Sequence, residues 1–353
     1  MPVFDANLLR QFTQEIFCAI GASSEEADIV AKELVSANLV GHDSHGVIRI
    51  MQYVETVRNG KIKPGAAVQV VRETRAMAVL DAQFGFGQVA ASRALDAAMS
   101  KARDSAVSAV WVRNCNHIGR LGSYTERAAA AGFSALMAIS SPGGRSVAPF
   151  GGIDRRMGTN PISIAVPARP GPLVLDMTTS AVAEGKLRVA FQKGEQVPPG
   201  WIIDSEGRPS TDPKQFYGEP RGAILPLGGD LGYKGFGLSL MLDALCGALS
   251  GFGAIRPDLV AGTNAVWLTL YHVEQLFPVA DFHTEIDHLS THVKSSRKVP
   301  GTAEILLPGE IETRRAAQRR TAGIPIPDET WRQICETARL LGVSPPAPQG
   351  GAS

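Results

Sequence analysis

The chain has 353 residues, which exceeds the usual size of one domain and allows one large α/β unit or two to three domains. Its 35 Lys and Arg residues against 34 Asp and Glu residues give a formal net charge of +1, so general binding to nucleic acids or acidic membranes is excluded. The 44% apolar and 20% charged fractions are typical of a soluble α/β protein.

The first 60 residues show helical periodicity. Apolar residues between Leu8 and Ile20 recur every three to four positions, and Gly21 is suited to end that helix. The S-x-x-E pattern at 23–26 predicts a capping box and a second helix that ends at Gly41. A third helix is predicted from Ser44 to the stop at 59–60.

Strands and helices alternate after the Pro64-Gly65 turn. Strands are predicted at 68–71, 77–80, 107–113, 134–140, 162–166 and 173–175, and helices at 88–104 and 121–131. This alternation predicts an α/β core. Residues 236–249 are apolar on all sides, which predicts a helix inside the molecule, and a last helix is expected over 328–341.

Polar residues gather on the predicted third helix. His45, Arg49 and Tyr53 are spaced i, i+4, i+8 and therefore share one helix face, with Ser44 beside them at the helix start. A 2-oxo acid needs a guanidinium to hold its carboxylate and an imidazolium to donate a proton to its ketone oxygen. These residues therefore predict a substrate site, whereas the alternative interpretation is an exposed amphipathic helix with a capping serine.

His117 follows the predicted strand at 107–113. Ligands of open α/β sheets gather outside the carboxyl ends of strands, so His117 is a second candidate, with a structural histidine as the alternative. Residues 85–90 match G-x-G-x-x-[GA] between a strand and a helix. Because no acidic residue ends the next strand, we interpret this segment as a tight turn and not as a nucleotide fingerprint.

A glycine-rich loop at 228–237 leads into the predicted apolar helix. It is not a Walker A motif, but backbone N–H groups beside Lys234 could bind a diphosphate or a 2′-phosphate. A loop that permits close helix packing is the other interpretation, and the sequence does not decide between them.

No metal site is predicted. His288 and His292 are spaced i, i+4, but H-E-x-x-H is absent, so a surface helix is favoured. The four cysteines lie far apart without a C-x-x-C pair, which indicates neither a disulfide framework nor a zinc site. With no signal-peptide pattern and no run of about 18 apolar residues, we expect a cytoplasmic protein without a membrane partner.

Seven motifs occur in an order that resembles the malate/L-lactate dehydrogenase family of NAD(P)-dependent oxidoreductases, which is distinct from the Rossmann lactate dehydrogenases. The resemblance extends from Leu8 to Leu341. The motifs are Gly41-His42-Asp43-Ser44-His45-Gly46-Val47 with Arg49 and Tyr53, Asn116-His117-Ile118-Gly119, Ala148-Pro149-Phe150-Gly151-Gly152, Gly158-Thr159-Asn160-Pro161, Leu175-Asp176-Met177-Thr178-Thr179-Ser180, Lys234-Gly235-Phe236-Gly237 and Leu306-Leu307-Pro308-Gly309-Glu310.

The resemblance implies an α/β fold with a non-Rossmann nucleotide-binding domain around a mixed sheet. A helical N-terminal part would be joined by the C-terminal helix. We expect residues 1–74 to form the helical part with the catalytic residues, 75–310 the NAD(P)-binding domain, and 311–353 a C-terminal helical segment that packs on the N-terminal part. The resemblance also implies a homodimer.

Residue roles follow from the same resemblance. Ser44 and His45 match a catalytic pair, His117 matches a second catalytic histidine, and Arg49 and Tyr53 match substrate-binding positions. The aspartate of a Ser-His-Asp relay has no secure match, since Lys186 stands near the expected place. The expected cofactor-binding residues are His45, Gly119, Arg120, Leu121, Ser141, Val174, Leu175, Asp176, Met177, Thr178, Tyr233, Lys234, Asn264, Gly309, Glu310, Ile311 and Glu312.

The expected activity is the reversible NAD(P)H-dependent reduction of a small 2-oxo carboxylic acid to the 2-hydroxy acid. NAD or NADP would serve as cofactor, with NADPH slightly favoured. Two alternatives remain open at this point. One is NADPH-dependent reduction of a cyclic imine carboxylate of the piperideine or pyrroline-2-carboxylate type, and the other is a non-catalytic nucleotide-binding protein.

Overall fold

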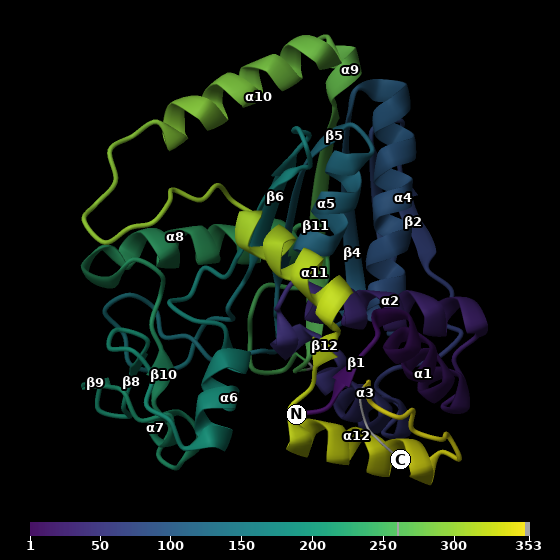
Figure 1. Ribbon diagram of the computed structural model, residues 1–353, viewed down its shortest axis with the longest axis vertical. Coiled ribbons are helices and arrows are strands. Elements are labelled where there is room, and N and C mark those ends of the chain that lie inside the picture. The colour runs from purple at the N-terminus through teal and green to yellow at the C-terminus, as the bar shows by residue number, and fades with distance from the viewer. Residues whose placement is uncertain (260, 350–353) are drawn as a thin grey trace.

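The computed structural model describes residues 1–259 and 261–349. Residues 350–353 of the predicted C-terminal segment lie outside the described residues. A large sheet forms the centre of the molecule (Figure 1). In the described part of the chain its strands are β2 (Gln69–Glu73), β3 (Met77–Asp81), β4 (Val107–Asn116), β5 (Phe133–Ser140), β6 (Ile162–Val166), β7 (Leu173–Met177) and β11 (Thr263–His272).

The strand order in this sheet is β2-β3-β4-β11-β5-β6-β7. β3 and β4 pair in parallel, whereas the other neighbouring strands pair antiparallel. The sheet is therefore mixed, as predicted, and differs from the parallel sheet of a Rossmann domain. In the central strand β11, alternate residues Val266, Leu268 and Leu270 are fully buried, as expected for a strand that is covered by helices.

Helices α4 (Gly87–Ser105) and α5 (Gly122–Ala130) pack on one face of the sheet (Figure 1). α4 turns a row of small side chains towards the strands, among them Ala91, Ala94 and Ala98, each completely buried. Small side chains allow the helix axis to approach the sheet closely. The Tyr124 hydroxyl of α5 donates to the carbonyl of Ile118, which ties α5 to the loop after β4.

The other face of the sheet is covered by α8 (Tyr233–Leu242) and the π-helical segment η4 (Asp243–Ala248). The Trp111 indole of β4 donates to the carbonyl of Leu245 at 3.0 Å. The sequence predicts a helix over 236–249 that is buried on all sides. This prediction is wrong for the side that faces away from the sheet. Leu240, Met241 and Leu249 are 48%, 57% and 58% exposed, because they point away from the sheet that buries Leu242.

The N-terminal part of the chain is helical, and the C-terminal helix packs against it. Phe4, Leu9 and Ile16 pack in one apolar cluster with Ile334, and the Trp331 ring lies 4.2 Å from that of Phe4. The capping box predicted at 23–26 is present. These observations confirm the predicted helical part joined by the last helix. Its elements are β1 (Val3–Phe4), α1 (Ala6–Ala19), α2 (Ser24–Leu39), α3 (Ile50–Arg58), β12 (Ile324–Pro325) and α12 (Asp328–Leu340), with β1 paired to β12.

A smaller unit projects beside the main sheet (Figure 1). Its three strands pair in the order β10-β8-β9 within the described residues, and Leu187, Ile202 and Phe216 fill its apolar centre. Its importance for the site is that it places the start of α6 against the N-terminal part. The elements are α6 (Glu184–Lys193), β8 (Ile202–Ile203), β9 (Pro209–Ser210), α7 (Lys214–Tyr217) and β10 (Ala223–Ile224).

The remaining helices lie towards the C-terminal end of the chain. They are α9 (Val273–Leu276), α10 (Val279–Lys294) and α11 (Glu310–Ala322). α10 has no buried residue and the His288 side chain is mostly exposed, which confirms the predicted surface helix. Within the described residues 1–259 and 261–349, there is no group of three or more His, Cys, Asp or Glu side chains that could hold a metal ion. None of the described helices is long and apolar enough to cross a membrane.

Candidate active site

The predicted third helix is interrupted at its start. Ser44 and His45 belong to the 3₁₀ turn η1 (Asp43–His45), Arg49 ends the 3₁₀ turn η2 (Val47–Arg49), and Tyr53 lies on α3. The prediction that one continuous helix carries these residues is therefore wrong. The reason lies in Gly46, whose backbone is extended and packs against the side chain of Asn38 on α2. Oδ1 of Asn38 accepts a hydrogen bond from the Val47 N–H at 2.8 Å. This bond caps η2, which therefore starts as a separate turn after η1.

The two turns nevertheless bring the predicted groups together. The Ser44 hydroxyl oxygen lies 3.0 Å from Nδ1 of His45. Arg49 donates from Nε to the Ser44 carbonyl at 2.7 Å and from Nη1 to Oε1 of Gln52 at 2.6 Å. Nε therefore holds the turn and Nη1 binds α3, whereas Nη2 has no hydrogen-bond partner among the described residues.

His117 reaches the same place from the loop after β4. Its ring centroid lies 5.6 Å from that of His45, with an angle of 23° between the ring planes. Its Nδ1 is 2.6 Å from the Tyr53 hydroxyl, which also accepts from Nε2 of Gln88 at 2.8 Å. Tyr53 is only 2% exposed. Its hydroxyl therefore already has two protein partners, and the substrate contact that the resemblance implies for Tyr53 stays a prediction.

Burial and neighbouring cations keep both histidines neutral. Desolvation, with smaller contributions in the same direction from the charge of Arg49 and from His42 and Arg120, lowers the pKa of His45 to about 3. Desolvation, Arg49 and His45 likewise lower the pKa of His117 well below its ordinary value. An anion bound beside these rings would offset this effect, so the site favours a negatively charged ligand.

The low pKa of His45 predicts a measurable loss of stability in acid. Between pH 6.5 and about pH 3 the unfolded chain binds a proton at this residue and the folded chain does not, so stability is complete above pH 6.5 and falls as the pH is lowered. One such group contributes a slope of about 1.4 kcal/mol per pH unit. The free energy of unfolding, measured with urea at several pH values below 6.5, should fall less steeply with decreasing pH in His45→Gln than in the unchanged protein. An equal dependence on pH in the two proteins would contradict the assignment.

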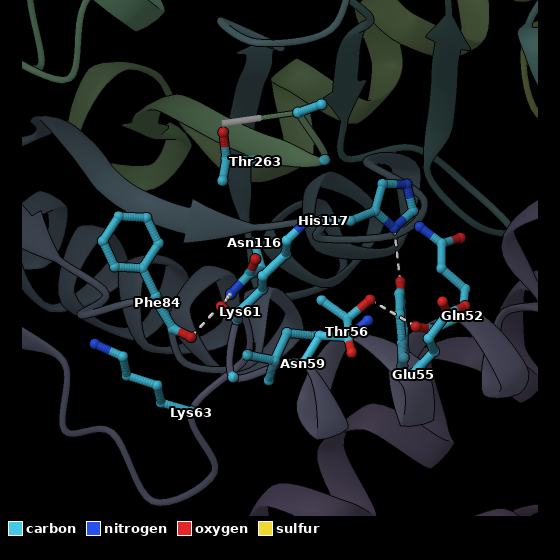
Figure 2. A pocket seen from close by; sticks show the side chains of 15 residues that line it. Gln52, Glu55, Thr56, Asn59, Lys61, Lys63, Phe84, Asn116, His117 and Thr263 are labelled. Atoms are coloured by element: carbon cyan, nitrogen blue, oxygen red, sulfur yellow. Dashed lines mark hydrogen bonds between the residues drawn. The ribbon is translucent and has the colours of Figure 1, made fainter. Parts of the chain in front are cut away.

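A cavity of about 540 Å³ adjoins His117 on the side of α3 (Figure 2). Figure 2 shows Gln52, Glu55 and Thr56 along α3, with Asn116 and His117 across from them. Tyr53 also lines this cavity, whereas Ser44, His45 and Arg49 are not among its lining residues. The cavity therefore leads to His117 from outside the group formed by His45 and Arg49.

The start of α6 closes the other side, a contact that sequence reasoning missed. A Cβ atom on Gly185 would lie 2.6 Å from Cβ of Ser44 and 3.9 Å from Nη2 of Arg49. The Glu184 carboxylate accepts from Arg188 at 3.0 Å and from the Tyr217 hydroxyl at 2.7 Å, so the first turn of α6 is held in place. Lys186 is exposed on α6 and offers no aspartate-like partner to His45.

Several residues expected to bind the cofactor lie along one edge of the large sheet. Oδ1 of Asn264 accepts the Ile118 N–H at 3.1 Å, and its amide donates to the Ser141 hydroxyl at 3.3 Å. The Asp176 carboxylate accepts the Gly122 N–H at 2.8 Å and lies 3.4 Å from Nε of Arg120. The segments that follow β4 and β5 therefore meet at the start of β11, and Asp176 near the end of β7 contacts the segment after β4.

The other expected cofactor residues lie at two further places. Gly309 packs on β7, where its Cβ position would be 3.2 Å from the Val174 nitrogen, and it leads into α11. Near the start of α11, Glu312 lies 3.3 Å from Nε2 of His42. Tyr233 is half exposed at the start of α8, where its ring contacts Phe150.

The glycine-rich loop before α8 has a packing explanation. A Cβ atom on Gly235 would lie 2.3 Å from the carbonyl oxygen of Leu227, so only glycine fits there. A Cβ atom on Gly237 would meet no other atom of the described residues within 4 Å, so packing does not require glycine there. Close packing therefore accounts for Gly235 without a bound phosphate.

Comparisons with known proteins agree with this arrangement. The family model for malate/L-lactate dehydrogenase matches residues 4–335. Hydroxycarboxylate dehydrogenase B of Escherichia coli (strain K12) is 38% identical over 96% of this chain and 94% of its own length. The structure of malate dehydrogenase from Pyrococcus horikoshii superposes with a TM-score of 0.88 at 34% identity, over 98% of this chain and 96% of that one.

A third comparison concerns a different acceptor. The structure of delta1-piperideine-2-carboxylate reductase from Pseudomonas syringae pvar. tomato matches with a TM-score of 0.81 at 27% identity, over 96% of this chain and all of that one. Dehydrogenases of the matched family use a nicotinamide cofactor, NAD or NADP. The chain belongs to the malate/L-lactate dehydrogenase family and is an oxidoreductase that acts on 2-hydroxy acids.

Proposed function

We propose that the protein reduces a small 2-oxo carboxylic acid reversibly to the 2-hydroxy acid with NADPH or NADH. The observation that carries the proposal is that the His45 and His117 rings stack beside the Arg49 guanidinium, whose Nη2 has no hydrogen-bond partner among the described residues. A guanidinium nitrogen can bind the substrate carboxylate, and imidazole rings can bind the C2 oxygen.

We assign roles to these side chains on that basis. Arg49 holds the carboxylate, and the two histidines contact the oxygen at C2, where a proton is gained in reduction and lost in oxidation. The Ser44 hydroxyl orients His45 through Nδ1, so that Nε2 is the nitrogen left for the substrate. Tyr53 acts through His117 in this scheme and not by direct substrate contact.

The sheet edge beside the histidines fits a nicotinamide nucleotide. Nε of Arg120 is buried there without a hydrogen-bond partner in the described part of the chain, although it pairs electrostatically with Asp176. A buried donor of this kind is suited to a phosphate or ribose oxygen. A reduced nicotinamide bound at this edge would supply the hydride to C2. We propose that the cofactor is held by His45, Gly119, Arg120, Leu121, Ser141, Val174, Leu175, Asp176, Met177, Thr178, Asn264, Gly309, Glu310, Ile311 and Glu312, with Tyr233 and Lys234 as further candidates.

NADPH is the proposed preference over NADH. Arg314 and Arg315 lie within two turns of the start of α11, where a guanidinium could meet a 2′-phosphate. Arg314 is already paired with Glu304, so the expected preference is small. Titration of protein fluorescence with each reduced coenzyme measures it, and a lower Kd for NADH would contradict it.

A homodimer is proposed from the outer side of α8. The exposed apolar side chains of Leu240 and Met241 on α8, and of Leu249 at the end of η4, support this proposal. Sedimentation velocity should show two copies, and Met241→Glu should lower the dimer fraction; a monomer at all concentrations would contradict this.

We also propose the division into residues 1–74, 75–310 and 311–353, supported by separate apolar clusters in the helical part and beneath the sheet.

A substrate panel tests the proposed activity. Purified protein is mixed with NADPH or NADH and with pyruvate, oxaloacetate, other short 2-oxo acids, or a cyclic imine carboxylate, and coenzyme oxidation is followed by absorbance. Turnover is expected with at least one 2-oxo acid, and the 2-hydroxy acid with oxidised coenzyme should give the reverse reaction. Turnover of the cyclic imine alone would favour an imine reductase, and coenzyme binding without any turnover would favour a non-catalytic protein.

A further inference from the structure

The segment 85–90 that resembles a dinucleotide fingerprint packs against the loop that carries His117. Gly87 is the first residue of α4, and a Cβ atom there would lie 2.2 Å from the carbonyl oxygen of Asn116 and 2.4 Å from that of His117. Only glycine allows backbone to approach this closely. Close packing therefore accounts for Gly87, and its neighbour is the candidate catalytic loop.

The next residue, Gln88, begins a chain of hydrogen bonds that ends on His117. Gln88 is 1% exposed, and its amide nitrogen donates to the Tyr53 hydroxyl oxygen at 2.8 Å. The same hydroxyl lies 2.6 Å from Nδ1 of His117. These groups come from three separate elements, α4, α3 and the loop after β4, and two of the three side chains are completely enclosed.

Donor and acceptor counting fixes the direction of this chain. An amide NH₂ group can only donate, so the Tyr53 oxygen accepts from Gln88. The single hydroxyl proton of Tyr53 then has Nδ1 of His117 as its acceptor among the described residues, so the hydroxyl donates and Nδ1 accepts. A neutral imidazole that accepts at Nδ1 carries its own proton on Nε2.

We propose that Gln88 is a positioning residue that acts through Tyr53 to hold His117 as the Nε2–H tautomer. The catalytic consequence rests on the proposed function. In that reaction, His117 presents an N–H donor to the C2 oxygen of the substrate. A ring that already carries Nε2–H cannot accept the hydroxyl proton of a 2-hydroxy acid at that nitrogen, so in oxidation the proton passes to His45. His45 can serve because its Nδ1 proton can be donated to the Ser44 hydroxyl oxygen, which leaves Nε2 as the base.

Gln88→Glu reverses the chain with almost no change in shape. An ionised carboxylate can only accept a hydrogen bond, so the Tyr53 hydroxyl donates to it, and the Tyr53 oxygen then accepts a hydrogen bond from Nδ1–H of His117. The proton of His117 is therefore expected to move from Nε2 to Nδ1. Gln88→Met removes the donor at similar volume and should leave both tautomers populated. Ser92→Ala is the matched control, since Ser92 is a buried polar residue on the same helix that contacts Arg127 and not Tyr53.

Nitrogen NMR of the histidine rings measures the tautomer directly. The full-length protein is labelled with nitrogen-15 and studied at neutral pH without substrate, and the His117 signals are identified by their loss in His117→Gln. The unchanged protein and Ser92→Ala should show a protonated Nε2 and an unprotonated Nδ1. Gln88→Glu should show the opposite. Its kcat with a 2-oxo acid should fall by roughly 10²- to 10⁴-fold while KM changes little, because Gln88 is enclosed and does not reach the substrate.

Two results would overturn the proposal. One is a protonated Nδ1 in the unchanged protein, and the other is an unchanged tautomer in Gln88→Glu at a pH where the introduced carboxyl group is ionised. If Gln88→Glu does not fold, the spectra of the unchanged protein and of Gln88→Met still decide the question. The measurement needs neither substrate nor coenzyme, so its outcome is separate from the substrate panel that tests the proposed function.

Discussion

Replacing Gly185 with alanine is expected to lower kcat/KM for a 2-oxo acid by about 10²-fold, because small displacements of reacting groups have effects of this order. The new methyl group would lie 2.6 Å from Cβ of Ser44 and 3.2 Å from its hydroxyl oxygen, so Ser44 or α6 must move. Ser44 holds His45 through its hydroxyl group and Arg49 through its carbonyl group. A shift of Ser44 therefore displaces both groups that are proposed to contact the substrate.

Two controls separate this effect from a general loss of folding. Gly171→Ala adds a methyl group where no atom lies within 4 Å, and its kinetics should match those of the unchanged protein. The double variant Ser44→Gly with Gly185→Ala removes the atom that is struck, so the second substitution should cost little activity beyond Ser44→Gly alone. Overpacking itself should cost about 1–3 kcal/mol in urea unfolding. A Gly185→Ala protein with unchanged kcat/KM would show that α6 does not position the site.

Local sequence patterns predicted most elements because those elements depend on neighbouring residues. The S-x-x-E pattern at 23–26 forms its capping box between residues three positions apart. The apolar run at 134–140 forms β5 as expected, and the mixed sheet was implied by the family resemblance. Spacing already grouped His45, Arg49 and Tyr53, although on a single helix, and the resemblance added catalytic roles for Ser44, His45 and His117.

Errors arose where a distant residue decides the local structure. The spacing of His45, Arg49 and Tyr53 predicts one helix, but the Asn38 side chain on α2 occupies the space beside Gly46 and binds the Val47 N–H. Helical periodicity within 44–59 contains no information about Asn38. The apolar segment at 236–249 shows a related limit, since hydrophobicity alone does not distinguish a buried helix from one with an exposed apolar side.

Gln88 and Gly185 show why supporting residues escape sequence reasoning. Gln88 lies inside the segment 85–90, at a variable position of the motif that its glycines define. Its partner Tyr53 is 35 positions away, and the two meet because Gly87 lets α4 approach the loop after β4. Gly185 precedes Lys186, which stands near the place where an aspartate was expected. Only the fold brings Gly185 against Ser44. Neither residue has a pattern in the chain that points to its partner.

Arg49→Lys is expected to raise KM for a 2-oxo acid by about 10- to 100-fold, the amount that corresponds to a lost hydrogen bond to a charged group. Arg49 uses Nε for the Ser44 carbonyl and Nη1 for Gln52, which leaves Nη2 for the carboxylate. Lysine has one charged nitrogen and cannot hold the turn and the substrate at the same time. The effect on kcat should be smaller, because the carboxylate is bound before and after hydride transfer.

The methyl ester of the same 2-oxo acid provides the control for Arg49→Lys. It lacks the carboxylate, so the unchanged protein and the variant should reduce it with similarly low kcat/KM. Gln52→Ala leaves the guanidinium in place but removes one of its two anchors, and its KM should lie between those of the other two proteins. A near-normal KM for Arg49→Lys would mean that Arg49 only supports the turn at Ser44. An equal loss with acid and ester would mean that the substitution disturbs His45, since that damage does not depend on the substrate carboxylate.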